Sequence, residues 1–128
     1  MKLKISIFLV ALAISLSFLS GWVMGRANLS TPNTVIHHVA LKWKEGTTEA
    51  DKQKAITMLK EIIADTPGAK NMWTRTIKVQ PREFSQTFGV EFENEAALKA
   101  YAEHPKKKAW EDFYYSIREK SNNCVIGN

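Results

Sequence analysis

Hydrophobic and polar residues repeat at two different periods along this chain, and each change of period marks an expected element. In "TVIHHVALKWK" (34–44), one set of alternate residues is almost entirely apolar, which is the pattern of a β-strand with one buried face. Residues 45–68 instead repeat apolar side chains at helical spacing, with Lys and Glu opposite them. Thr48 with Asp51 three residues later predicts the start of this helix, and Pro67-Gly68 predicts its end.

Two further segments return to the extended pattern. Residues 69–81 are expected to form a strand that Pro81 stops, and residues 84–93 alternate apolar and polar side chains again. The connection between them is short, so we expect the two strands to pair as a hairpin. Residues 122–128 predict a short final strand.

Two amphipathic helices are predicted between the hairpin and the last strand. Asn94 is the expected cap of a helix over 95–104, and a helix with an aromatic face follows over 107–120. The His104-Pro105 step separates them, because the residue before a proline avoids the helical conformation. We interpret this step as a helix junction.

The order of the elements predicts an α+β fold. A β-α-β-β-α-β chain with one apolar sheet face favours a ferredoxin-like arrangement, in which helices cover one side of an antiparallel sheet. The opposite side carries Ile36 and Ala40, and no remaining segment is expected to cover them. We therefore expect two copies to pair through their sheets as a homodimer with a barrel-like interior.

The N-terminus has a different character from this domain. Lys2 and Lys4 precede a long uncharged stretch, so residues 1–27 are expected to be a signal peptide or an N-terminal membrane anchor. Residues 28–33 are a polar linker, and residues 34–127 form the domain of about 95 residues. Either interpretation places the domain outside the cytoplasm, as an exported periplasmic or extracellular protein or as a membrane-anchored one.

Charge and cysteine content change this picture little. Of the formal net charge of +5, three positive charges belong to Lys2, Lys4 and Arg26, which leaves +2 for the rest of the chain. Such a balance does not indicate a nucleic-acid partner. Cys124 is the single cysteine, so no internal disulfide is possible. We expect Cys124 to be buried beside Val125, the alternative being a disulfide between chains.

Several motifs together resemble one known family. His37 lies in an apolar strand that ends in "LKWKEG", "TPGA" follows the first helix, and "VEFENEAALKAYAEHP" precedes an aromatic helix. As a set, from Val35 to Ile126, these segments resemble the Dabb, or stress-responsive A/B barrel, domain family. The resemblance implies a ferredoxin-like subunit that dimerises through its sheet into an α+β barrel.

The resemblance also implies roles for individual residues. The family members that are enzymes act as cyclases on polyketide-like substrates without a cofactor, and His37 and Tyr101 match two of the residues involved. Lys107 stands where such enzymes have a third residue, a histidine. In a run of three lysines it is expected to be solvated, and a charged lysine is not a base. The structural alternatives are a buried, hydrogen-bonded His37 and a Tyr101 that belongs to the core.

Two functions remain open from the sequence. In the first, the homodimer binds a small apolar or aromatic molecule without catalysis; in the second, it is a cofactor-independent cyclase or isomerase that uses His37 and Tyr101. His38 faces away from His37, so a metal site is not expected. The resemblance to the Dabb family implies that no cofactor is needed. The candidate ligand pocket is lined by Val39, Leu41, Gln86, Phe88, Val90 and Lys107, with Lys107 at its mouth.

Overall fold

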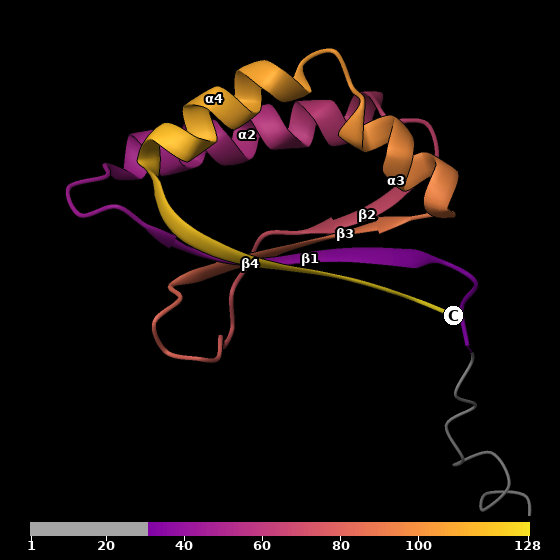
Figure 1. The fold of residues 1–128 in the computed structure, drawn as a ribbon, viewed down its shortest axis with the longest axis horizontal. Helices are drawn as coiled ribbons and strands as arrows, with labels where there is room; N and C mark the ends of the chain where they lie inside the picture. The colour runs from indigo at the N-terminus through magenta and orange to yellow at the C-terminus, as the bar shows by residue number, and fades with distance from the viewer. Residues whose placement is uncertain (1–30) are drawn as a thin grey trace, which may run out of the picture. The chain divides into compact units, whose positions relative to one another are not determined.

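The structure is a computed structural model that describes residues 31–128, with four strands and three helices (Figure 1). The strands form one antiparallel sheet in the order β2-β3-β1-β4. The elements in chain order are β1 (Val35–Trp43), α2 (Glu49–Asp65), β2 (Ala69–Trp73), β3 (Gln86–Phe92), α3 (Glu95–Ala102), α4 (Lys107–Ile117) and β4 (Arg118–Gly127).

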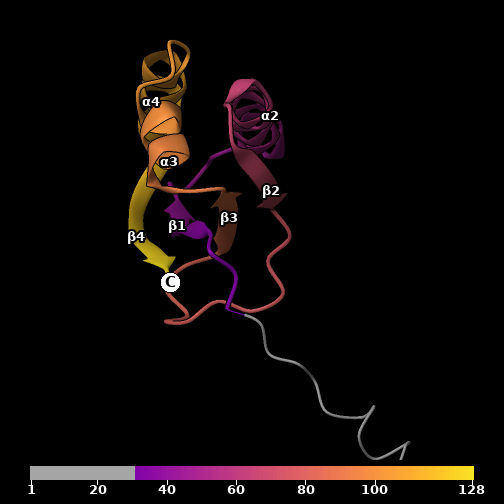
Figure 2. The ribbon, with the colours of Figure 1, turned by 90° about the vertical axis from the view of Figure 1, so that its right-hand side faces the viewer.

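All three helices lie on the same face of the sheet (Figure 2). Strand β1 is central and pairs with both β3 and β4, so that His37 lies between Val90 on one side and Val125 on the other. This is the ferredoxin-like α+β arrangement that the sequence predicted. The inner face of the sheet is therefore the face toward the helices, and the outer face is the opposite one.

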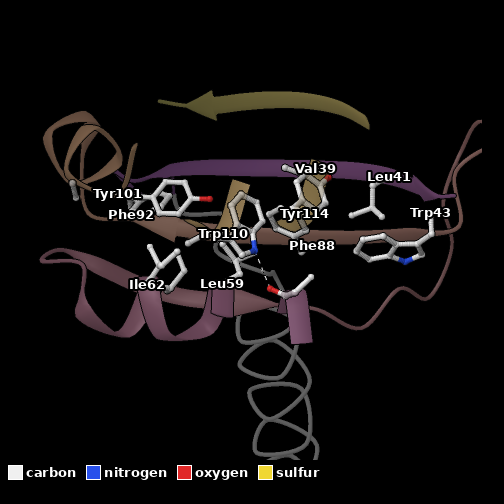
Figure 3. Close-up of a cluster of buried hydrophobic side chains, with 14 residues drawn as sticks. Val39, Leu41, Trp43, Leu59, Ile62, Phe88, Phe92, Tyr101, Trp110 and Tyr114 are labelled. Atoms are coloured by element: carbon white, nitrogen blue, oxygen red, sulfur yellow. Dashed lines mark hydrogen bonds between the residues drawn. The ribbon is translucent and has the colours of Figure 1, made fainter. Parts of the chain in front are cut away.

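A hydrophobic core fills the space between the inner face and the helices (Figure 3). The Trp110 indole stacks on the Tyr114 ring with centroids 4.7 Å apart, and its Nε1 donates a buried hydrogen bond of 2.9 Å to the Ala55 carbonyl. This bond fixes α4 against α2. The core also contains Val39, Leu41, Trp43, Leu59, Ile62, Ile63, Phe88, Val90, Phe92, Ala97 and Tyr101.

The ends of α2 agree with the expected signals. The Thr48 hydroxyl accepts a hydrogen bond of 3.1 Å from the Asp51 amide, which caps the first turn. After the helix, Gly68 has a φ of 79°, and a Cβ placed on it would lie 2.7 Å from the Ala97 Cβ. The turn into β2 thus requires glycine both for its backbone angle and for the close approach of α3.

Strand β2 is shorter than the sequence predicted. It ends at Trp73 rather than Pro81, and the connection to β3 is correspondingly long. The Thr87 amide of β3 donates its hydrogen bond, 2.7 Å long, to the side-chain hydroxyl of Thr76 instead of to a strand carbonyl. A side chain has therefore replaced the backbone pairing that would have extended the strand.

The same connection corrects the expectation that nothing covers the outer face. It runs beneath the sheet on the side away from the helices (Figure 1). Phe84 is buried there, the Ser85 amide bonds to the Leu41 carbonyl, and Ala40 is only 6% exposed. The cover is partial, because Trp73 and Ile126 remain 51% and 57% exposed.

Strand β4 is longer than the expected 122–128 segment and begins directly after α4. It is the edge of the sheet, and its residues beyond Ser121 are exposed on both faces. Cys124 is exposed, so the expectation that it is buried in the single chain is wrong. It pairs with His38 on the outer face, and the partial cover from the β2–β3 connection does not bury it.

The predicted leader and the first half of the linker, residues 28–30, lie outside the described residues. None of the helices in residues 31–128 is long and apolar enough to cross a bilayer.

Candidate functional site

Three polar side chains from three elements meet at the margin of the apolar core, where Tyr101 is buried and His37 and Lys107 are half-buried. His37 comes from β1, Tyr101 from α3 and Lys107 from the first turn of α4. The His37 and Tyr101 rings have centroids 6.1 Å apart, and the Lys107 Nζ lies 2.6 Å from the Tyr101 hydroxyl. We refer to His37, Tyr101 and Lys107 as the polar cluster.

His37 points from the inner face of β1 toward the helices, as its place in the alternating pattern predicted. Its ring meets the Phe88 ring edge-on, and its Nδ1 is buried with no hydrogen-bond partner among the described residues. Burial lowers the pKa of His37, and the charges of Lys107 and His38 lower it further. His37 is therefore a neutral imidazole at pH 7, with one nitrogen able to accept a proton.

Tyr101 lies on the buried side of α3, one turn after Ala97. The Asn94 side chain fixes the start of this short helix by accepting a 3.0 Å hydrogen bond from the Ala97 amide. Burial raises the pKa of Tyr101, so its hydroxyl stays protonated. That hydroxyl accepts a hydrogen bond from Lys107, and its own proton has no acceptor among the described residues.

Lys107 corrects the expectation of a solvated lysine. Its side chain is 13% exposed, and its Nζ lies 3.9 Å from the Tyr101 ring centroid and 4.3 Å from that of Trp110. Burial lowers the pKa of Lys107 to about 8, while Glu111, whose carboxylate is 3.9 Å away, opposes the shift. Lys107 is thus close to losing its charge at neutral pH.

The two neighbouring lysines behave as the sequence predicted. Lys106 pairs with Asp65 at 2.9 Å, and Lys108 pairs with Asp112, all on the exposed surface. These hydrogen bonds raise the pKa of both lysines. Position on the helix explains the difference. Lys107 lies on the same side of α4 as the buried residues Trp110 and Tyr114, whereas Lys106 and Lys108 face outward.

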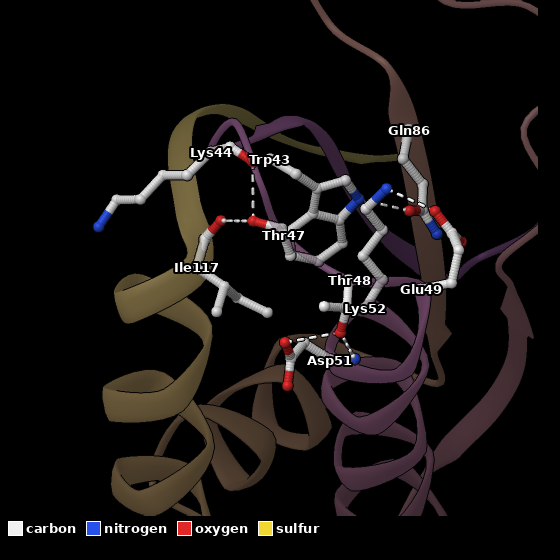
Figure 4. A network of polar contacts seen from close by, with 9 residues as sticks. All are labelled: Trp43, Lys44, Thr47, Thr48, Glu49, Asp51, Lys52, Gln86 and Ile117. Atoms are coloured by element: carbon white, nitrogen blue, oxygen red, sulfur yellow. Dashed lines mark hydrogen bonds and ion pairs between the residues drawn. The ribbon is translucent and has the colours of Figure 1, made fainter.

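The remaining predicted pocket residues are parts of the core. Val39, Leu41, Phe88 and Val90 are at most 3% exposed. The Gln86 amide oxygen accepts a 2.8 Å hydrogen bond from the Trp43 indole, which explains the one polar side chain on this face (Figure 4). Their contact with a ligand stays a prediction.

A groove of about 700 Å³ lies between α3 and the end of the sheet, and none of the three side chains of the polar cluster lines it. Its wall includes Val125, the cross-strand partner of His37, and Leu98 and Ala102, which flank Tyr101 on α3. A second, smaller groove of about 330 Å³ lies across α3 and includes Ala100. The sequence indicated neither groove, because both depend on how α3 sits over the sheet.

The part of the chain that the structure describes contains no group of three His, Cys, Asp or Glu side chains placed to hold a metal ion. What the site offers is a neutral imidazole, a protonated phenol and an amine of lowered pKa. Such groups bind a ligand oxygen, move protons or attack a carbonyl carbon.

The sheet order and the helices on a single face define a ferredoxin-like α+β domain. Residues 35–122 match the family model of the stress responsive A/B barrel domain, Dabb, and the chain belongs to this family. A search of the curated proteins finds no match.

Solved structures share the fold. The chain is similar to a Dabb family protein with a ferredoxin-like fold from Mesorhizobium loti, at 21% identity, covering 74% of this chain and 96% of that one with a TM-score of 0.63. A dimeric ferredoxin-like protein of unknown function from Thermobifida fusca has 20% identity, coverage of 80% and 99% and a TM-score of 0.62. The hydroxynitrile lyase of Passiflora edulis has 16% identity, coverage of 76% and 94% and a TM-score of 0.65.

Proposed function

We propose that this protein is an exported homodimer that binds a small apolar or aromatic molecule beside the polar cluster. The observation that carries the proposal is unused hydrogen-bonding capacity in a buried place. The His37 Nδ1 has no partner, and the Tyr101 proton has no acceptor, among the described residues. Buried polar groups are normally paired, so a ligand oxygen that satisfies both would gain binding energy.

The adjoining groove provides room for the apolar part of such a ligand. Its volume of about 700 Å³ lies within the range of small-molecule sites. Its lining includes the apolar Val35, Leu98 and Val125 and the charged Glu95 and Lys99. We propose that the ligand extends from the groove past Val125, the cross-strand partner of His37, so that an oxygen substituent reaches His37.

Binding can be tested with 2-naphthol, whose hydroxyl can donate to the His37 Nδ1 and accept from Tyr101, followed by tryptophan fluorescence. The variant Ala102→Phe fills the groove from an exposed position on α3, and we expect it to weaken binding at least ten-fold. Ala100→Phe, on the same helix but in the smaller groove, is the matched control and should leave the affinity unchanged. Equal affinity in all three proteins would contradict the proposed site.

The homodimer is supported by the surface of the sheet and by the family. Trp73 on β2 and Ile126 on β4 expose large apolar side chains on the outer face, one at each edge of the sheet. Structures with the same fold are described as dimeric. We therefore propose that a second copy covers this face.

Export is proposed from the sequence alone. The two lysines followed by a long uncharged stretch in residues 1–27 have the form of a leader or anchor. N-terminal sequencing of the protein recovered from the producing cells tests this: a mature chain starting near residue 28, or an intact chain in the membrane fraction, is expected. An intact chain in the soluble cytoplasm would exclude export.

Lys107 favours a second candidate function, a cofactor-independent cyclase or isomerase. His37 is neutral and can accept a proton at neutral pH, and the pKa of about 8 leaves a minor fraction of Lys107 able to do the same. Abstraction of a proton next to a carbonyl is the first step of such reactions. Deuterium exchange into acetylacetone, followed by NMR, should fall at least ten-fold in His37→Ala; exchange unaffected by this change excludes the mechanism.

A further inference from the structure

Lys107 is held as an amine rather than as a surface cation. Among the described residues its Nζ makes one close polar contact, the 2.6 Å hydrogen bond with the Tyr101 hydroxyl, and otherwise lies against the faces of two aromatic rings. The Glu111 carboxylate is 3.9 Å away and is itself 32% exposed. Lys106 and Lys108 instead have direct carboxylate partners on the surface.

The surroundings leave a reactive fraction of this amine without its proton. With a pKa of about 8, about a fifth of Lys107 is neutral at pH 7.4, against about a thousandth for an ordinary lysine. A neutral amine is a nucleophile, and lysines of this kind are known to attack carbonyl compounds. The groups that face it are His37 from β1, Tyr101 from α3, and Glu111 from its own helix.

We propose that Lys107 forms an imine with a small aromatic aldehyde or ketone, with the Tyr101 hydroxyl as the proton donor to the carbonyl oxygen. The Lys107 nitrogen forms a bond to the carbonyl carbon, and one proton reaches the oxygen to give a carbinolamine. The carbon–oxygen bond then breaks, water leaves, and a carbon–nitrogen double bond remains. No oxidant or reductant is required.

The geometry assigns a task to each member of the polar cluster. Tyr101 touches the Lys107 nitrogen and remains protonated because it is buried, so it can donate where the oxygen leaves. The neutral His37, with its buried and unpartnered Nδ1, can accept the proton that the nitrogen loses. The inference rests on the proposed function for its ligand class and location, and it adds a covalent step.

The test uses the full chain, 4-hydroxybenzaldehyde as the probe, and cyanoborohydride, which reduces an imine to a stable amine. Cleavage after Glu103 and Glu111 releases the peptide His104–Glu111, which contains Lys106, Lys107 and Lys108 together. Fragmentation of this peptide in a mass spectrometer locates the adduct. We expect at least ten-fold more adduct on Lys107 than on either neighbour at pH 7.4, and equal or lower labelling of Lys107 would overturn the proposal.

Two variants and one further ligand complete the experiment. Lys107→Arg keeps the charge but should abolish the selective adduct, and Tyr101→Phe keeps the ring but should slow labelling at least five-fold. The probe 4-hydroxybenzyl alcohol has the same ring and no carbonyl group. If both probes bind and no adduct forms, the imine is overturned and the proposed function stands. If neither probe binds, the imine and the proposed function are both overturned. If a variant fails to fold, the adduct on Lys107 relative to Lys106 and Lys108 in the wild-type peptide still tests the imine.

Discussion

At the scale of single residues, burial of one ammonium group couples the stability of the fold to pH. Lys107 has a pKa of about 8 in the folded protein and about 10.5 in an unfolded chain. Between these values the unfolded chain binds more protons, so the free energy of unfolding rises with pH across this window. Below pH 8 the cost of burying the charge is fully present.

Replacing Lys107 with methionine should therefore stabilise the protein at neutral pH. We expect Lys107→Met to raise the free energy of unfolding by about 1–2 kcal/mol at pH 7, because the lost charge outweighs the lost hydrogen bond to Tyr101. At pH 10 most of this gain should disappear, since wild-type Lys107 is then already neutral. Urea unfolding at both pH values measures the difference. A variant that is less stable than wild type at pH 7 would show that the burial carries no cost.

The sequence could predict the position of Lys107 on its helix, but not its removal from water. Helical spacing from Trp110 and Tyr114 places Lys107 on the apolar stripe of its helix. The run of three lysines argued for solvation instead. What removes Lys107 from water is the Tyr101 side chain, which comes from a different helix, and no local pattern in the sequence reports that contact.

At the scale of elements, the turn between α2 and β2 packs so closely against α3 that Gly68 has no room for a side chain. Gly68 and Gly46 both have positive φ angles, but a Cβ would meet Ala97 at 2.7 Å only in the first case. We expect Gly46→Ala to cost about 1 kcal/mol of unfolding free energy and Gly68→Ala about 2–3 kcal/mol, because the second change adds a steric clash to the backbone strain. Urea unfolding midpoints compare the two variants. Equal losses of unfolding free energy would mean that α3 shifts to make room for the methyl group added at Gly68.

Helix α3 links stability to the site, because it positions Tyr101. Asn94→Ala and Thr48→Ala each remove a side-chain cap and should each cost about 1 kcal/mol. Only the first cap belongs to the helix that carries Tyr101, so Asn94→Ala should also weaken 2-naphthol binding. Fluorescence titration of both variants measures this, and a similar loss of affinity in Thr48→Ala would show that general destabilisation is responsible.

Alternation and capping signals predicted the elements well where the backbone pairs with itself. The caps at Thr48 and Asn94 and the helix junction at His104-Pro105 are confirmed. The prediction was wrong for the end of β2, because the Thr76 hydroxyl supplies the partner that a strand carbonyl was expected to supply. A side chain that takes the place of a backbone hydrogen-bond partner does not change the alternation of apolar and polar residues, so the sequence pattern cannot predict it.

At the scale of the whole molecule, the outer face of the sheet determines the expected assembly. An aspartate there would be buried without a partner in a dimer, which is costly. We expect Trp73→Asp and Ile126→Asp each to raise the dissociation constant of the dimer at least ten-fold, as measured by light scattering after size exclusion. Tyr115→Asp is the matched control, because Tyr115 is 49% exposed on the helical layer. Dissociation caused equally by the control would place the interface elsewhere.

The fold as a whole followed from the order of the elements, whereas the cover on the sheet did not. The expectation of a bare outer face rested on the absence of any further predicted element. The irregular connection that buries Phe84 and Ala40 has no periodicity by which to predict it. The partial cover leaves exposed Trp73 and Ile126 for a second copy.

The most direct test of this account is the titration of the Lys107 amine in the intact protein. NMR of lysine labelled with ¹³C at Cε follows each amine separately, and Lys107→Arg identifies the signal. We predict a transition near pH 8 for Lys107, with Lys106 and Lys108 titrating above the usual 10.5. A Lys107 signal that titrates together with its two neighbours would place its charge in water and contradict the site.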